Sequence, residues 1–199
     1  ITHSSYSQSL SKQWYGDRSN PYWKVIPLVR SVDNLTDYDI ARRDLGFNED
    51  DFVLCSFGFL DDTKQNHRVL QAWFNSFVSK DHRCKLIFVG ENNGGEYGKR
   101  LLKMILDSGC ADRVSITGFV DREVYHKYLA AADLAVQLRT ESRGETSAAV
   151  LDCMNHAVPT VVNANGSMAE LDQQAVWLLP DLFSDASLVE AFERLWESI

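Results

Sequence analysis

The sequence lacks the features that mark membrane-spanning, secreted and nucleic-acid-coating proteins. No stretch approaches the roughly 18 consecutive apolar residues of a transmembrane helix, and no secretory signal peptide opens the chain. Only 20 basic residues stand against 28 acidic ones, which gives a net charge of −8. Such a chain does not attract nucleic-acid phosphates or an anionic membrane surface. The 199 residues, 45% of them hydrophobic, predict one sizeable globular domain.

Paired cysteines and metal-binding spacings are absent as well. The four cysteines, Cys55, Cys84, Cys110 and Cys153, are far apart and form no CxxC pair. We therefore expect free thiols in a reducing compartment, which favours a cytoplasmic protein. The histidines show neither HxxxH nor HExxH spacing, so we expect no metal cofactor.

From residue 50 onward, short apolar runs alternate with helical patterns. We predict strands at Phe52–Phe57, Lys85–Val89, Arg113–Thr117, Asp133–Leu138, Thr160–Val162 and Ala175–Leu179. Helices are expected at Gln65–Val78, Glu96–Ser108, Asp121–Ala131, Glu145–His156, Ser167–Leu171 and Leu188–Glu197. Nearly continuous apolar strands need helices on both faces of their sheet. The pattern predicts an α/β fold, a doubly wound, Rossmann-like parallel sheet of about six strands.

The first 45 residues show a different pattern. Leu10–Trp14 is compatible with part of a helix, and Gly16, Pro21 and Pro27 interrupt the chain after it. We interpret this region as the end of a preceding domain and a connector. The opening without an initiator Met suggests a piece of a longer chain.

The loop after the first predicted strand, Gly58–Arg68, combines a glycine with basic side chains. Gly58 permits a tight turn, and Lys64 stands at the start of a helix, where a phosphate meets an ammonium group and free N–H groups. The same residues are typical of a solvated helix start with ordinary surface charges. The spacing alone leaves both interpretations open.

The loop Arg139–Ser147 is a second candidate anion site, because two arginines, a glycine and hydroxyl groups precede a helix. Glu145 and Asp152 are two helical turns apart, so a helix from Glu145 would place both carboxylates on one face, suited to sugar hydroxyls. A capping cluster before an ordinary helix is the alternative. The loop Asn163–Glu170 is a weaker candidate, and Gly90–Gly98 matches no nucleotide motif and predicts a mobile loop.

Taken in order, these segments resemble the C-terminal, nucleotide-sugar-binding half of a GT-B glycosyltransferase and are most similar to glycosyltransferase family 4. The resemblance rests on Val25–Pro27, Ser56–Gly58 with Lys64, Leu86–Gly90, Arg113–Phe119 and, most strongly, Gly144–Val162. It runs from about residue 23 to the end. It implies a domain at 23–199, with residues 1–22 as the tail and connector of a missing N-terminal domain.

The resemblance also implies roles for individual residues. Lys64 matches the lysine that contacts the donor diphosphate, and Asp152 matches the second acid of the family's E-x7-E motif, which holds the ribose. Phe119 and Val120 fall where the family contacts the base. The remaining diphosphate residues are Gly58, Arg143, Gly144, Thr146 and Ser147, and Glu145 is the candidate catalytic acid.

Three positions depart from the family pattern. Gly144 stands where the family has its first acid, with Glu145 one residue later, and Phe59 replaces an arginine. Leu28–Val29 replaces the Asn-Gly of the family's connector. We hypothesise that Arg143 or Arg139 supplies the missing positive charge.

By resemblance, the chain is the donor-binding half of a retaining glycosyltransferase of the hexosyltransferase type, active in polysaccharide biosynthesis. It would transfer a sugar from a nucleotide-diphosphate sugar, without a metal, to a glycan or lipid-linked acceptor held by the missing domain. That domain would also provide any peripheral membrane contact, and the isolated piece is expected to be inactive. The alternatives are a non-catalytic nucleotide-sugar-binding or scaffold domain of a polysaccharide-assembly protein, and a sugar-nucleotide epimerase or phosphorylase on the same architecture.

Overall fold

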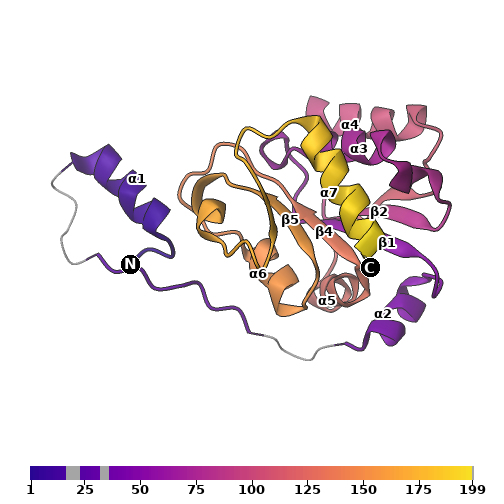
Figure 1. Cartoon of the computed structure of the whole chain (residues 1–199), viewed down its shortest axis with the longest axis horizontal. Helices are drawn as coiled ribbons and strands as arrows, with labels where there is room; N and C mark the ends of the chain where they lie inside the picture. Colours follow the sequence, from indigo (N-terminus) through magenta and orange to yellow (C-terminus); the bar gives the residue numbers. More distant parts are fainter. Residues whose placement is uncertain (17–22, 32–35, 199) are drawn as a thin grey trace.

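A computed structural model describes residues 1–16, 23–31 and 36–198. One parallel sheet of six strands forms its centre, in the order β3-β2-β1-β4-β5-β6 (Figure 1). The strands are β1 (Phe52–Phe57), β2 (Cys84–Val89), β3 (Val114–Ile116), β4 (Leu134–Gln137), β5 (Thr160–Asn163) and β6 (Trp177–Leu179). The doubly wound parallel sheet predicted from the alternating pattern is thereby confirmed. The strand order reverses between β1 and β4, and in such sheets ligands bind beyond the carboxyl ends of the strands at this point.

Helices cover both faces of the sheet (Figure 1). One face carries α3 (Asn66–Asn75), α4 (Glu96–Asp107) and α7 (Asp185–Ser198), and the other carries α2 (Tyr38–Leu45), α5 (Arg122–Ala131) and α6 (Ala148–Asn155). Alternate residues of β1 enter the two cores: Leu54 packs with α3 and α7, whereas Val53 and Cys55 pack with α5 and α6. Because both faces are buried, the strands need apolar residues at successive positions.

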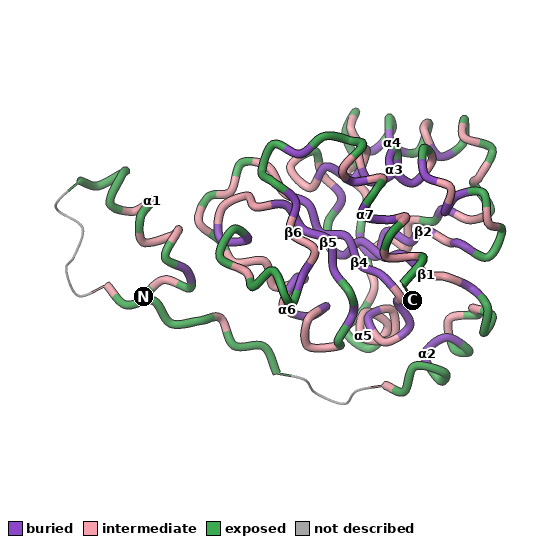
Figure 2. Tube along the Cα trace, in the orientation of Figure 1, coloured by how far each residue is buried: buried purple, intermediate pink, exposed green. Residues whose placement is uncertain are grey.

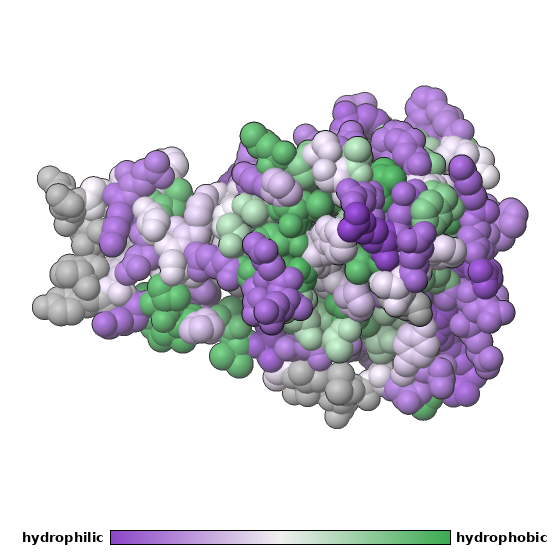
Figure 3. Space-filling view, viewed as in Figure 1, coloured by the Kyte–Doolittle hydropathy of each residue, from purple (hydrophilic) through white to green (hydrophobic). Residues whose placement is uncertain are grey.

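Burial reflects this layered arrangement. The central strands are buried, while the exposed positions lie on the outer sides of the helices and along the N-terminal segment (Figure 2). The visible surface is mostly hydrophilic towards α2 and α4, with hydrophobic side chains gathered nearer the middle (Figure 3). No helix of the described residues is long and apolar enough to cross a membrane.

Several predicted boundaries differ from the structure. The helix predicted at 65–78 ends at Asn75, because Ser76 takes an extended conformation, and a 3-10 helix follows at Phe77–Lys80. Two further 3-10 helices cover Asp62–Lys64 and Gly166–Glu170. The helix predicted from Glu145 begins at Ala148.

Two α-helices form among the described residues of the N-terminal region. The fragment predicted at Leu10–Trp14 belongs to the longer helix α1 (Ser5–Tyr15), which Ser4 caps by accepting from the Ser7 N–H. The helix α2 was not predicted. Its residue Arg42 is 3% exposed and donates to the Asp133 carboxylate at 3.0 Å, which fastens α2 to the domain. Of the predicted tail, residues 17–22 lie outside the described part of the chain.

All four cysteines are free, as predicted from their spacing. Among the described residues, no group of three or more His, Cys, Asp or Glu is placed to hold a metal ion. That the reaction needs no metal stays a prediction.

Candidate functional site

The exit of β1 forms a tight turn with a lysine above it. Gly58 has φ 103°, a conformation that favours glycine, and a Cβ atom at this position would lie 3.4 Å from the Lys64 Nζ. Gly90, at the exit of β2, lies against the same turn: a Cβ there would be 2.1 Å from the Gly58 carbonyl oxygen. Two glycines are therefore needed for the strand ends to approach each other. The sequence analysis included Gly90 in the family resemblance, as the end of Leu86–Gly90, but gave no sign of its contact with Gly58.

The loop after β2 is fastened to this turn. The Leu60 N–H donates to the Glu91 carbonyl at 2.9 Å, and Asn93 donates from its side-chain amide to the Asp61 carboxylate at 2.8 Å. The prediction of a mobile loop at 90–98 is therefore wrong for its first residues, which complete the β1 exit.

Lys64 lies at the end of a 3-10 helix that leads into α3, as expected for a cation at a helix start. Burial lowers the pKa of Lys64, the nearby Arg139 guanidinium lowers it further, and Glu145 opposes both effects. The two loops are also joined by backbone bonds, since the Thr140 N–H donates to the Thr63 carbonyl at 2.9 Å. The structure thus brings Lys64 of one candidate loop together with Arg139 and Glu145 of the other.

Arg139 is held in place by a buried asparagine at the end of β5. The Asn163 side chain is fully buried, accepts from the Arg139 N–H at 2.8 Å and donates to the Arg139 carbonyl at 2.8 Å. The Arg139 guanidinium then forms an ion pair with Glu145. The sequence predicted that the strand ends at Val162 and that Asn163 begins a turn-like loop, so its role as a support at the end of β5 was not evident.

Glu145 and Asp152 do not share a helix face, and that prediction is wrong. Ser147 caps α6 by accepting from the Val150 N–H at 3.4 Å, and Gly144 has φ 100°, so Glu145 remains in the preceding loop. There its carboxylate accepts from the Arg143 N–H at 2.7 Å in addition to pairing with Arg139.

Asp152 lies about one turn into α6 and is 5% exposed. Its carboxylate accepts from Arg30 through two bonds of 2.8 and 2.9 Å and from the Tyr125 hydroxyl at 3.2 Å. Burial, followed by the charge of Asp152, raises the pKa of Tyr125 strongly, so this hydroxyl stays protonated as a donor. Arg30 and Tyr125 gave no signal in the sequence because each reaches Asp152 only through the tertiary fold.

The segment Gly144–Ser147 lies beneath α1. The Ser7 hydroxyl donates to the Gly144 carbonyl, and a Cβ at Gly144 would lie 3.5 Å from the Leu10 side chain. The Thr146 hydroxyl is buried and has no partner among the described residues. Glu170 receives the first N–H groups of α1, with the Ser5 N–H at 3.0 Å.

The residues predicted to contact the base lie in the loop just before α5. The Phe119 side chain is 83% exposed, while Val120 packs against the core on the α5 side of the sheet. Arg143 is exposed, and its guanidinium has no ion-pair partner within the described part of the chain. The structure leaves both Phe119 and Arg143 accessible.

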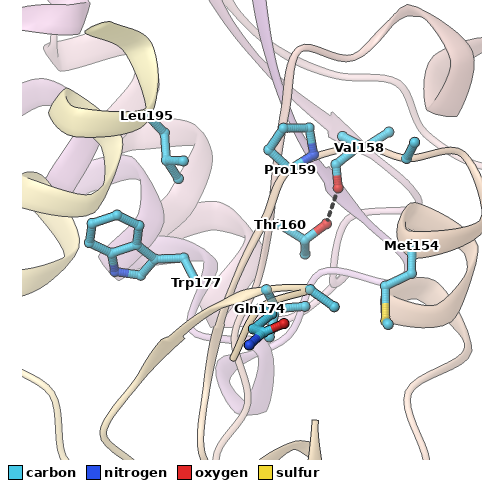
Figure 4. Close-up of a pocket in the computed structure, with 10 residues that line it drawn as sticks. Met154, Val158, Pro159, Thr160, Gln174, Trp177 and Leu195 are labelled. Carbon is cyan, nitrogen blue, oxygen red and sulfur yellow. Dashed lines mark hydrogen bonds between the residues drawn. The ribbon is translucent and has the colours of Figure 1, made fainter. Parts of the chain in front are cut away.

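A hollow of about 440 Å³ lies at the opposite end of the sheet, where β5 and β6 begin (Figure 4). Its lining includes Met154, Val158, Pro159, Thr160, Trp177 and Leu195. The Thr160 hydroxyl donates a hydrogen bond to the Val158 carbonyl at 2.7 Å. Of the residues that the structure describes, no charged one lines this hollow. It therefore offers no counter-charge for a phosphate, unlike the loops at the carboxyl ends of the strands.

Comparison with solved structures supports this arrangement of the fold. HepE from Anabaena, solved with UDP and glucose, is 23% identical with a TM-score of 0.77; the match covers 99% of this chain and 53% of HepE. Sucrose-phosphate synthase from Thermosynechococcus elongatus is 18% identical with a TM-score of 0.83, over 99% of this chain and 48% of the enzyme. The C-terminal domain of the glycosyl transferase LpcC from Francisella tularensis is 16% identical with a TM-score of 0.70, over 81% of this chain and 83% of that domain.

The chain thus spans about half the length of HepE and of sucrose-phosphate synthase. A search of curated protein sequences finds no match. The family described as glycosyl transferases group 1 matches residues 37–198, which include the whole sheet and the loops at its carboxyl ends. The chain therefore belongs to the glycosyl transferases group 1 family.

Proposed function

We propose that this chain is the donor-binding half of a retaining glycosyltransferase. Its substrate is a nucleotide-diphosphate sugar, and the acceptor is a glycan or a lipid-linked glycan. Membership of the glycosyl transferases group 1 family supports the reaction class. The bound UDP and glucose of HepE, which has the same fold, support a nucleotide-sugar donor.

The observation that carries this proposal is the proximity of Lys64 to the ion pair of Arg139 and Glu145, beyond the carboxyl ends of β1 and β4. A diphosphate placed there meets two cations. Because Lys64 is partly buried, its charge is less screened than that of a surface lysine. Asp152 offers a carboxylate for the ribose hydroxyls.

Sugar transfer breaks the bond between the anomeric carbon and the diphosphate oxygen, and negative charge grows on the leaving diphosphate. Preorganised cations lower the barrier by stabilising that charge. In this chain Lys64 and Arg139 fill that role, since Asn163 fixes the Arg139 backbone before the donor arrives. Glu145 holds the Arg139 guanidinium and positions it.

We also propose that residues 1–22 are the tail of a further domain that supplies the acceptor site. The side chains of Trp14 and Tyr15 at the end of α1 are 77% and 68% exposed. Together with Leu10, Trp23 and Arg143 they line a hollow of about 660 Å³ beside the donor loops. Exposed aromatic side chains in such a cluster favour a contact with another domain.

Calorimetric titration with UDP, GDP and ADP tests the donor site. One nucleoside diphosphate should bind, and Lys64→Ala and Asp152→Ala should each weaken binding about tenfold or more, because each removes a charged hydrogen-bond partner. Lys103→Ala is the matched control, since the Lys103 side chain is 75% exposed and pairs with Asp107 on α4. Equal binding by Lys64→Ala and the control would refute the assignment.

A non-catalytic nucleotide-sugar-binding domain is the second candidate. Two features favour it: Gly144 stands where the family resemblance calls for the first acid of the E-x7-E motif, and the neighbouring Glu145 is already paired with Arg139. Assays of the full-length protein distinguish the two functions. Donor binding without transfer or donor hydrolysis would identify the binding domain.

A further inference from the structure

The segment 23–31, which lies between α1 and α2 and is called the connector below, places Arg30 at the carboxylate of Asp152. Arg30 donates to both oxygens of that carboxylate, at 2.8 Å from Nε and 2.9 Å from the terminal nitrogen. The hydrogen bond to Asp152 raises the pKa of Arg30, so the side chain remains a cation. Tyr125 donates to the same carboxylate at 3.2 Å.

These contacts leave little room for a ribose. A carboxylate has about four lone-pair sites, and Arg30 and Tyr125 use three of them on Asp152. A ribose that presents two hydroxyl groups needs two free sites. Asp152 is also only 5% exposed, so an approaching nucleoside cannot reach its carboxylate while Arg30 stays in place.

We propose that Arg30 is an internal competitor for the donor nucleoside: its guanidinium occupies the ribose-binding carboxylate of Asp152 and must swing away before the nucleotide sugar binds. This inference rests on the proposed function. It makes donor affinity depend on the connector, the segment that joins α1 to the donor-binding domain.

The geometry permits this exchange without unfolding the connector. The Asn155 side-chain amide donates to the Arg30 carbonyl at 3.1 Å, so α6 holds the connector backbone independently of the guanidinium. The Arg30 side chain is 40% exposed, so its long aliphatic part can change conformation towards solvent. The ribose hydroxyls then replace the guanidinium as donors to a buried carboxylate that would otherwise keep only the Tyr125 hydroxyl as a donor.

The test compares the binding of UDP, GDP, ADP and inorganic pyrophosphate to wild type and Arg30→Gln. Removing the competitor should strengthen binding of the favoured nucleoside diphosphate about tenfold or more, because no charged hydrogen bond has to be broken first. Pyrophosphate has no ribose, so its affinity should be the same in both proteins. Arg194→Gln removes the same charge from α7, where Arg194 pairs with Glu190, and should bind every ligand as wild type does.

Each other outcome has a defined meaning. Equal nucleotide affinity in wild type and Arg30→Gln refutes the proposal that Arg30 competes with the nucleoside, but does not contradict the proposed donor site. Weaker binding of both nucleotide and pyrophosphate to Arg30→Gln also overturns it, because Arg30 would then be a phosphate contact. If no nucleotide binds to either protein, while thermal unfolding shows that both are folded, the proposed function is refuted. The proposed competition by Arg30 is then refuted as well, because it rests on that function.

Discussion

Replacing Gly90 by alanine tests the tight approach of the two strand ends that supports Lys64. The added Cβ would lie 2.1 Å from the Gly58 carbonyl oxygen and 2.6 Å from its carbon. Ordinary C···O contacts are at least about 3.3 Å, so the turn must move by roughly 1 Å. Both clashing atoms are backbone, so no flexible side chain can yield instead.

The expected cost has two parts. Overpacking of this size costs about 1–3 kcal/mol. The hydrogen bond from the Gly58 N–H to the Val89 carbonyl, 2.9 Å long, is strained or lost, at about 0.5–1.5 kcal/mol. We therefore expect the free energy of unfolding of Gly90→Ala to be lower by about 2–4 kcal/mol. At about 2–4 °C per kcal/mol for a domain of this size, the melting temperature falls by roughly 4–16 °C.

Urea unfolding followed by circular dichroism measures this loss. Gly94→Ala is the matched control, because it lies in the same loop and a Cβ there meets nothing within 4 Å. It should be as stable as wild type to within about 0.5 kcal/mol. If Gly90→Ala matches this control, Gly90 does not approach the turn beneath Lys64 as closely as the structure shows, and the reasoning is refuted.

Three further predictions concern charge. Burial lowers the pKa of Lys64 below 10.5, so the affinity for a nucleoside diphosphate should fall as pH rises towards that lowered pKa. The affinity of Lys64→Arg should stay constant over the same pH range, because arginine keeps its charge. The same pH dependence in both proteins would contradict this. The hydrogen bond from the Arg83 side chain lowers the pKa of Asp81 from 3.8 to about 2. The resulting stabilisation is present above pH 3.8 and lost as pH falls towards 2, so Arg83→Ala should shift acid unfolding to higher pH, and an unchanged midpoint would refute it. Arg42→Met leaves Asp133 buried without its guanidinium and should cost about 3–5 kcal/mol in urea unfolding, whereas a loss under about 1 kcal/mol would show that the pair is dispensable.

The sheet was predictable because its signal is local and repeated. Strands such as Phe52–Phe57, buried on both faces, need continuous apolar sequence, and the predicted bounds of that strand agree with β1. The start of α5 was also predicted closely: Asp121, where the expected helix begins, caps α5 by accepting from the Val124 N–H. The helix α2 was missed, because it is short and Arg42 is anchored by residues far along the chain.

The candidate loops were also evident from the sequence, since the turn glycine Gly58 and the cation Lys64 lie close to a strand end. The contacts that those loops make with one another were not evident from the sequence. Glu145 and Asp152 are close in sequence, yet one pairs with Arg139 and the other with Arg30, because the helix between them begins only at Ala148.

The amino-acid sequence by itself determined the parallel sheet, the positions of the candidate loops at its strand ends and the family resemblance, because these depend on short-range hydrophobic patterns and turn residues. Only the tertiary structure decided the partners of the buried charges. Burial makes an unpaired ion costly, so a buried carboxylate takes the cation that the fold brings nearest. For Asp152 that cation is Arg30, 122 positions away in the chain.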